Sequence, residues 1–122
     1  FDEFRGPPRY SYAYRHKGID IAFYPDDAPV LALQAGTVSR VSFDPEGYGN
    51  YVVIDHGNGI ETLYAHLSSV SVGAGQKVRA GDVIGKQGST GRATGPHLHL
   101  ELHINGANVD PLPYLPPASY RG

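Results

Sequence analysis

The residues Gly95-Pro96-His97-Leu98-His99-Leu100-Glu101-Leu102-His103-Ile104 alternate between polar and apolar side chains from His97 onwards. A period of two is typical of a half-buried β-strand, with its apolar face in the core. The other face carries the polar residues, among them two imidazoles separated by a single residue. Imidazoles at positions i and i+2 of a strand point the same way and can converge on one small object. A metal ion is the natural candidate.

A strand cannot complete such a site alone, because a catalytic zinc ion is generally held by three protein ligands and keeps a fourth position open. A second source of ligands is the segment His16-Lys17-Gly18-Ile19-Asp20, with an imidazole and a carboxylate four residues apart. In a straight strand their Cα atoms would lie about 13 Å apart. Binding one metal ion therefore favours a bend between them, which Gly18 can supply.

Length and composition limit the kind of protein to which these residues belong. The chain has 122 residues, enough for one ordinary domain with a buried core. It contains no cysteine, so there is no disulfide framework, and a metal ion would be held by nitrogen and oxygen. With a net charge of −2 and no basic stripe, nucleic acid is a poor partner. No apolar run is long enough for a membrane span or a signal peptide.

The chain is predicted to be all-β, because no long segment combines a 3.6-residue period with helix capping signals. We expect an antiparallel β-sheet of sandwich or barrel-like form with few or no helices. A short echo between residues 35–38 and 80–83 hints at an internal duplication. Residues 1–15 are predicted to be an extended N-terminal arm, residues 16–115 the domain itself, and residues 116–122 a proline-rich tail.

The clearest local element is a β-hairpin. Residues 51–55 run into the turn His56-Gly57-Asn58-Gly59, and residues 60–65 run back. Asn58-Gly59 is well suited to the positive φ angles of a tight turn. We expect His66 to end the second strand and, by parity, to share a face with Thr62 and Tyr64. From there His66 could reach the groove formed by the polar face of residues 97–103.

Three motifs occur in order along the chain: His16-x-x-x-Asp20, then Tyr64-Ala65-His66-Leu67, then Gly88-Ser89-Thr90-Gly91 followed by Gly95-Pro96-His97-Leu98-His99. Together they resemble the signature of the lysostaphin/LytM-type zinc endopeptidases, which cut peptide cross-links in bacterial peptidoglycan. The likeness extends from about residue 15 to residue 115. It implies that family's antiparallel β scaffold with an internal duplication, and an extracytoplasmic location, whether periplasmic, cell-wall or secreted.

The resemblance implies that His16, Asp20 and His99 bind Zn²⁺, and that His66 and His97 are catalytic and flank the metal-bound water. Zinc held by two imidazoles and a carboxylate lowers the pKa of bound water and polarises a carbonyl group. His97 can accept the proton of that water, and His66 can orient the water or stabilise the tetrahedral intermediate. Which of the two does more stays open. The family's oxyanion-steadying tyrosine has three upstream candidates: Tyr10, Tyr12 and Tyr14.

Several other residues have a structural interpretation as well as a functional one. Glu101 can brace a ligand imidazole as a hydrogen-bond acceptor, or it can be an ordinary solvated glutamate. His103 is expected at the wall of the groove or in solvent, and His56 is expected to be a solvated turn residue. Residues 88–91 are expected to form a structural turn, because the lysine and helix of a phosphate-binding loop are missing.

The favoured function is a zinc-dependent endopeptidase that hydrolyses peptidoglycan cross-links. Tyr64-Ala65-His66-Leu67 resembles the motif of members that cut D-alanyl to diamino-acid bonds, an argument by analogy. The expected partners are therefore the stem or bridge peptides of peptidoglycan. The alternative is a zinc-retaining wall-binding or amidase-activating module without turnover. Relatives of that kind lose metal ligands, and this chain has lost none.

A third class, a biotinyl- or lipoyl-type carrier, is suggested by residues 78–85. Such carriers need a lysine at an exposed hairpin tip, usually beside methionine; the chain has no methionine, and neither Lys77 nor Lys86 has that setting. A phosphohistidine module would use paired histidines but would not need Asp20. A further hypothesis makes residues 1–15 the end of a longer regulatory segment that covers the groove.

Overall fold

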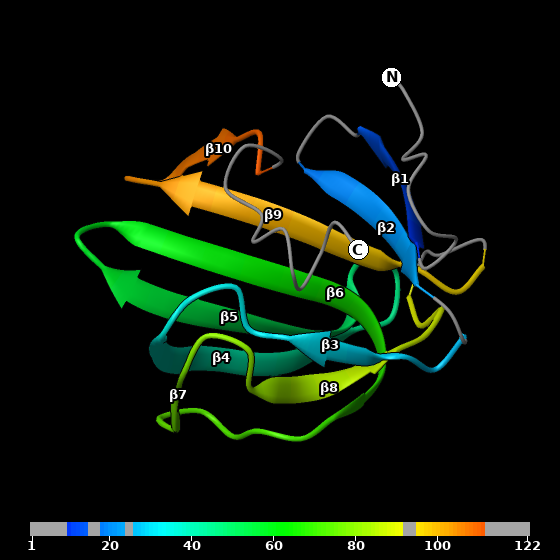
Figure 1. Cartoon of the computed structure of the whole chain (residues 1–122), viewed down its shortest axis with the longest axis horizontal. Helices are drawn as coiled ribbons and strands as arrows, with labels where there is room; N and C mark the ends of the chain where they lie inside the picture. The colour runs from blue at the N-terminus through cyan, green and yellow to red at the C-terminus, as the bar shows by residue number, and fades with distance from the viewer. Residues whose placement is uncertain (1–9, 15–17, 24–25, 92–94, 112–122) are drawn as a thin grey trace.

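The computed structural model describes residues 10–14, 18–23, 26–91 and 95–111. These residues contain ten strands and no helix, so the all-β prediction is confirmed (Figure 1). A helix long and apolar enough to cross a membrane is accordingly not found in the described part of the chain. The strands are β1 (Tyr10–Tyr14), β2 (Ile19–Phe23), β3 (Pro29–Leu31), β4 (Gly36–Asp44), β5 (Gly49–Gly57), β6 (Ile60–Val70), β7 (Lys77–Val78), β8 (Val83–Gln87), β9 (Leu98–Ile104) and β10 (Ala107–Val109).

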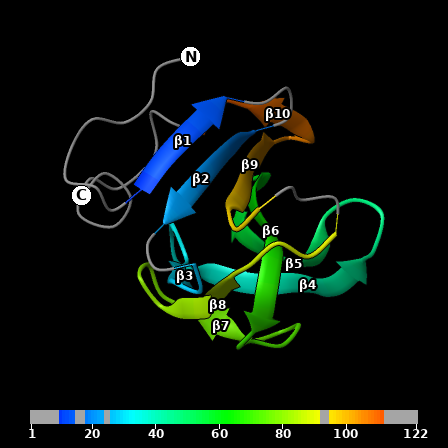
Figure 2. The same cartoon turned by 90° about the vertical axis from the view of Figure 1, so that its right-hand side faces the viewer.

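All strand pairs are antiparallel, and the main path of the sheet runs β1-β2-β9-β6-β5-β4-β7. β10 pairs with β9, and β8 pairs with both β3 and β6. The sheet curls without closing into a barrel, and β1 and β7 lie at the two ends of the path (Figure 2). On one edge, residues 98–100 of β9 pair with β2. On the other edge, residues 99–104 of β9 pair with β6.

The alternation predicted for β9 is confirmed, and its apolar face enters the core. Leu98 and Leu100 are fully buried, and burying a leucine contributes about 1.5–3 kcal/mol. A slip of one residue in register would bring His99 and Glu101 into the core in their place, so the register is strongly specified. The main core consists of Ile19, Ile21, Val30, Ala32, Leu33, Val38, Val52, Ile54, Tyr64, Leu67, Val78, Ile84, Leu98 and Leu100.

The predicted hairpin is formed by β5 and β6, with Asn58 and Gly59 at φ 56° and 79°. Two details differ from expectation. β6 does not end at His66 but continues to Val70. His56 is not a solvated turn residue: its Nδ1 lies 2.8 Å from the carbonyl oxygen of Ala35 and its Nε2 lies 2.8 Å from Oγ1 of Thr62. The ring thus ties the hairpin to the segment that precedes β4.

The chain bends at Gly18, as predicted, and then enters β2. A Cβ at position 18 would collide with the carbonyl oxygen of Leu100, so the glycine permits close approach of the backbone to β9. Residues 10–14 of the predicted arm form strand β1, which pairs with β2. The rest of the arm, and the tail at 116–122, lie outside the described residues, so the division into arm, domain and tail stays a prediction.

Candidate metal centre

Asp20 and His99, two of the three predicted metal ligands, lie opposite each other on β2 and β9. Oδ1 of Asp20 is 2.6 Å from Nδ1 of His99. Their side chains are 15% and 12% exposed, so solvent reaches the pair only in part. The pairing of two strands 79 residues apart therefore joins a carboxylate oxygen and an imidazole nitrogen. His16, the third predicted ligand, lies outside the described residues.

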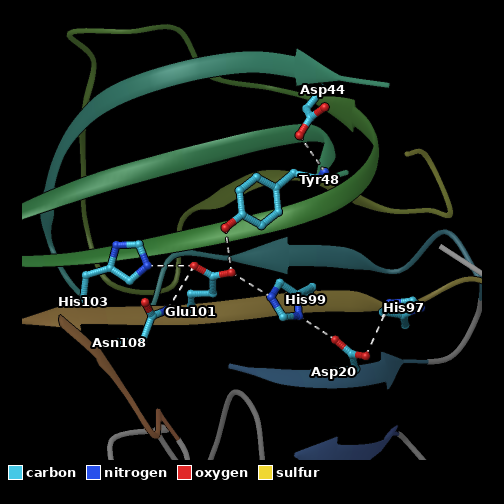
Figure 3. A network of polar contacts seen from close by, with 8 residues as sticks. All are labelled: Asp20, Asp44, Tyr48, His97, His99, Glu101, His103 and Asn108. Carbon is cyan, nitrogen blue, oxygen red and sulfur yellow. Dashed lines mark hydrogen bonds and ion pairs between the residues drawn. The ribbon is translucent and has the colours of Figure 1, made fainter. Parts of the chain in front are cut away.

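The other ring nitrogen of His99 faces Glu101, whose carboxylate is only 1% exposed. Nε2 of His99 lies 2.9 Å from Oε2 of Glu101, so one imidazole bridges two carboxylates (Figure 3). The interpretation of Glu101 as a solvated glutamate is therefore wrong. Its carboxylate instead accepts a hydrogen bond from the His99 ring, as the other interpretation expected. His103, expected at the groove wall or in solvent, also bonds to Glu101, with Nε2 2.7 Å from Oε1.

The bridge shifts the pKa values of both groups. Burial lowers the pKa of His99, but the hydrogen bonds to Asp20 and Glu101 outweigh it and raise the pKa to about 9. Burial raises the pKa of Glu101, but the hydrogen bonds from His99, His103 and Tyr48 outweigh it and lower the pKa to about 2. At neutral pH the metal-free pair is therefore an imidazolium donating to two carboxylates.

His97 lies beside this pair with its proton placed by the backbone. Its Nδ1 is 2.9 Å from the carbonyl oxygen of Gly95, which can only accept, so Nδ1 carries the proton. Its Nε2 is left facing Asp20, at 3.8 Å from Oδ2. The orientation directs Nε2 towards the predicted metal ligand.

His66 reaches the same face of the sheet, but not by the parity that was predicted. Across the β6–β9 ladder, Ala65 pairs with His99, whereas Tyr64 pairs with Leu100 of the core. Regular alternation would therefore have put His66 on the core face. Instead His66 has a φ of 65°, and the β5–β6 register gains one residue on β6 at this point. This bulge turns the imidazole to the site and returns Leu67 to the core.

The bulged conformation is held by two hydrogen bonds at His66. Its N–H donates to the carbonyl oxygen of Tyr48 at 2.7 Å, and its Nδ1 lies 2.8 Å from the carbonyl oxygen of Thr90. The ring centroids of His66 and His97 are 4.9 Å apart, and those of His66 and His99 are 6.0 Å apart. Burial lowers the pKa of His66 from its usual 6.5, opposed in part by the Thr90 carbonyl. His66 is therefore neutral at pH 7, with Nε2 free to accept a proton.

The turn that holds Thr90 packs directly against the turn before β5. A Cβ on Gly49, at φ 64°, would collide with the backbone of Thr90, and one on Gly91, at φ 73°, would collide with the backbone of Gly49. Oγ1 of Thr90 also donates to the carbonyl oxygen of Leu67 at 2.8 Å. The interpretation of residues 88–91 as a structural turn is thus supported, and the turn has the further effect of orienting His66.

Sequence reasoning missed Tyr48 and Thr90, which contact the site residues from loops. The only signal for Tyr48 was an aromatic residue between two glycines in a predicted loop. Thr90 belonged to one of the three motifs, but only as part of a structural turn and with no role at the site. The three tyrosines predicted as oxyanion candidates lie in β1, whose backbone pairs with β2, but their side chains are outside the described set. These candidates stay a prediction: Tyr10, Tyr12 and Tyr14.

The donor set at the centre fits a zinc ion. The described residues contain no group of three ligand-type side chains placed to hold a metal ion. They do bring one carboxylate oxygen and one imidazole nitrogen to 2.6 Å, with His99 oriented from behind by Glu101. Nitrogen and oxygen ligands backed by a hydrogen-bonded carboxylate are a common zinc environment. Asp20 and His99 would thus supply two ligands, and His16 remains the predicted third.

In the described residues, one face of an antiparallel sheet carries a carboxylate–imidazole pair and two further imidazoles, which are side chains of the kinds that metal-dependent hydrolases use. The chain belongs to peptidase family M23, whose family profile matches residues 14–111. The DD-carboxypeptidase/endopeptidase Mpg of Neisseria meningitidis is 54% identical over 97 residues, which cover 80% of this chain and 22% of that protein. The chain thus spans about a fifth of the length of this curated relative.

Two solved structures extend the comparison. The catalytic domain of the antimicrobial peptidase lysostaphin from Staphylococcus simulans superposes with a TM-score of 0.78 at 31% identity, covering 88% of this chain and 92% of that domain. A zinc-containing peptidase from Vibrio cholerae superposes with a TM-score of 0.73 at 35% identity, covering 88% of this chain and 34% of that chain. The described fold is therefore that of an M23 peptidase domain.

Proposed function

We propose that this chain is the catalytic domain of a zinc-dependent endopeptidase that hydrolyses peptide cross-links of bacterial peptidoglycan outside the cytoplasm. The observation that carries the proposal is the Asp20–His99 pair, 2.6 Å apart, with the neutral imidazole of His66 on the same face. The close match in extent to the lysostaphin catalytic domain supports the assignment of the chain as a catalytic unit. The name of the Neisseria relative, a DD-carboxypeptidase/endopeptidase, supports a DD bond as substrate.

His16, Asp20 and His99 would hold the zinc ion. When bound, zinc supplies positive charge that lowers the pKa of water and polarises the scissile carbonyl. The presence of a zinc-containing peptidase among the structural neighbours supports zinc over other ions that accept nitrogen and oxygen ligands. Glu101 keeps His99 in place while the other residues act on the substrate.

The proton transfers fall to the two remaining imidazoles. Backbone carbonyls of Thr90 and Gly95 accept the Nδ1 protons of His66 and His97, so Nε2 is the ring nitrogen that each histidine can present to water and substrate. One Nε2 takes a proton from the attacking water as the oxygen adds to the carbonyl carbon. The imidazolium so formed returns the proton to the leaving amine nitrogen as the C–N bond breaks. The neutral state of His66 at pH 7 suits it to start this cycle.

The substrate bond within peptidoglycan is proposed from two sources. The Tyr64-Ala65-His66-Leu67 motif resembles that of members that cut D-alanyl to diamino-acid cross-links, and the DD-endopeptidase name of a relative that is 54% identical agrees with it. The second candidate function, a wall-binding or amidase-activating module, is less favoured because Asp20, His66, His97 and His99 are all present.

The experiment is a mass-spectrometric digest of purified cross-linked peptidoglycan dimers, with and without a zinc chelator. We expect dimers to become monomers only where zinc is present, and the product masses to name the bond that was cut. His99→Ala protein serves as the matched control for contaminating hydrolases. Dimers that survive while the protein holds one zinc ion would favour the binding module instead.

A pH-dependent prediction follows from His99. Since the pKa of the metal-free imidazole is about 9, zinc must displace its Nδ1 proton, and binding at pH 7.5 should release about one proton from His99. Apparent zinc affinity should therefore rise about tenfold per pH unit below pH 9 and level off above it. Calorimetric titrations at pH 7.5 in two buffers of different ionisation enthalpy measure the release. Equal heats in both buffers would contradict the prediction.

A further inference from the structure

Four side chains converge on Glu101 from three parts of the chain, namely the turn before β5, strand β9 and strand β10. Tyr48 donates its hydroxyl to Oε2 at 2.8 Å, and Nε2 of His99 contacts the same oxygen at 2.9 Å. Nε2 of His103 lies 2.7 Å from Oε1, and Nδ2 of Asn108 lies 3.3 Å from it (Figure 3). Only 1% of the Glu101 side chain is exposed, so water has almost no access to its carboxylate.

The chemistry of these partners determines which nitrogen of His99 carries a proton. An ionised carboxylate only accepts hydrogen bonds, so Nε2 of His99 must donate to Oε2. The opposite ring nitrogen, Nδ1, then points at Asp20. Both the rotamer and the proton position of His99 are thus determined from the buried side of the ring, away from the exposed face where substrate would lie.

We propose that Glu101, held in place by Tyr48, is a positioning residue that fixes His99 so that the metal ion is bound through Nδ1. The proposal rests on the zinc site put forward above and adds a residue to it. Glu101 itself touches neither metal nor substrate and acts through the imidazole of His99.

Tyr48 is suited to this task because it contacts both halves of the site. Its ring stacks near His99, with centroids 6.2 Å apart and an interplanar angle of 23°. Its carbonyl oxygen accepts the N–H of His66, and its own N–H donates to Oδ2 of Asp44 at 3.3 Å. The turn before β5 therefore positions the carboxylate behind His99 and the backbone of His66 together.

A purely structural role for Glu101 would be satisfied by any group that fills the same space and bonds to its neighbours. The positioning role requires two acceptor oxygens on one side chain. In Glu101→Gln one oxygen becomes an NH₂ group, which cannot accept, so two of the four donors lose their partner. The variant keeps the size of the side chain and changes its charge and its hydrogen-bonding capacity.

The test measures zinc affinity by competition with a chromophoric chelator, together with the ring ¹⁵N shifts of His99 in the zinc-loaded protein. We expect Glu101→Gln to bind zinc about 10–100-fold more weakly, and its His99 shifts to depart from the pattern of a ring ligated at Nδ1 and protonated at Nε2. The matched control is Glu61→Gln, which removes the same charge on β6 opposite His103. This control should keep both the affinity and the shifts of the wild type.

Wild-type affinity and wild-type shifts in folded Glu101→Gln would overturn the proposal and leave the zinc endopeptidase assignment standing. Failure of the wild-type protein to bind zinc would overturn the assignment and this inference with it. If circular dichroism shows that Glu101→Gln is unfolded, the same measurements on Tyr48→Phe test the proposal, because this variant keeps the carboxylate of Glu101 and removes one of its donors. A drop of about threefold to tenfold in affinity with altered His99 shifts supports the proposal, and an unchanged Tyr48→Phe overturns it.

Discussion

His99→Ala will lose bound zinc and hydrolytic activity together. The imidazole of His99 lies between Asp20 and Glu101 at 2.6 and 2.9 Å, so its removal takes away one proposed ligand and the ring that bridges the two carboxylates. Substitution of a residue that is hydrogen-bonded to a metal ligand weakens metal binding by about 10–100-fold. Loss of a ligand itself should weaken binding by more than that. Zinc content after gel filtration and turnover of cross-linked dimers are the two measurements.

The matched control for this variant is His103→Ala, which removes an imidazole from the same face of β9 four residues further along. His103 contacts Glu101 but is not a predicted ligand, so the variant should retain one zinc ion per chain. Zinc retained at full stoichiometry in His99→Ala would contradict the ligand assignment. Zinc lost equally from both variants would point to disruption of the hydrogen bonds around Glu101.

Two elements of the fold could be predicted because their signals are local. The unbroken alternation of residues 97–104 specified β9 and its two faces, and Asn58-Gly59 between β-branched runs specified the hairpin of β5 and β6. What local pattern could not supply is the pairing of β2 with β9. That register brings Asp20 opposite His99 across 79 residues. The need for further metal ligands and the resemblance to a known family linked the two residues in advance, but neither predicted the register.

His66 was assigned to the site for a reason that the structure contradicts. Parity along β6 places His66 with Tyr64, whose ring is fully buried in the core. A bulge at His66, with a φ of 65°, reverses the direction of this one side chain. The amino-acid composition around His66 does not predict the bulge. The conformation depends on carbonyl groups of Tyr48 and Thr90, 18 and 24 residues away in the chain.

Glu101 illustrates the same division between local and distant causes. Alternation placed Glu101 on the polar face, where a glutamate is normally solvated. Its buried carboxylate bonds to His99 and His103 on the same strand, and to Tyr48 and Asn108 from outside that strand. Which of its two predicted environments was correct therefore depended on tertiary contacts.

His66→Asn will keep the fold and the bound zinc and lose turnover. Asparagine tolerates a positive φ better than alanine does, and its side-chain NH₂ can replace Nδ1 as the donor to the Thr90 carbonyl. It has no basic nitrogen in place of Nε2, so the variant removes the proposed proton acceptor and little else. Loss of a general base typically costs about 10²–10⁴ in rate, and we expect kcat for dimer hydrolysis to fall by that amount.

Circular dichroism and zinc content must match the wild type for the fall in kcat to be assigned to proton transfer. The parallel variant His97→Asn separates the two imidazoles, because the Nδ1 of His97 is held by Gly95 in the same way. A larger loss in His66→Asn than in His97→Asn would make His66 the main base, in keeping with its lowered pKa. Unchanged kcat in folded, zinc-loaded His66→Asn would instead show that His97 alone carries the proton.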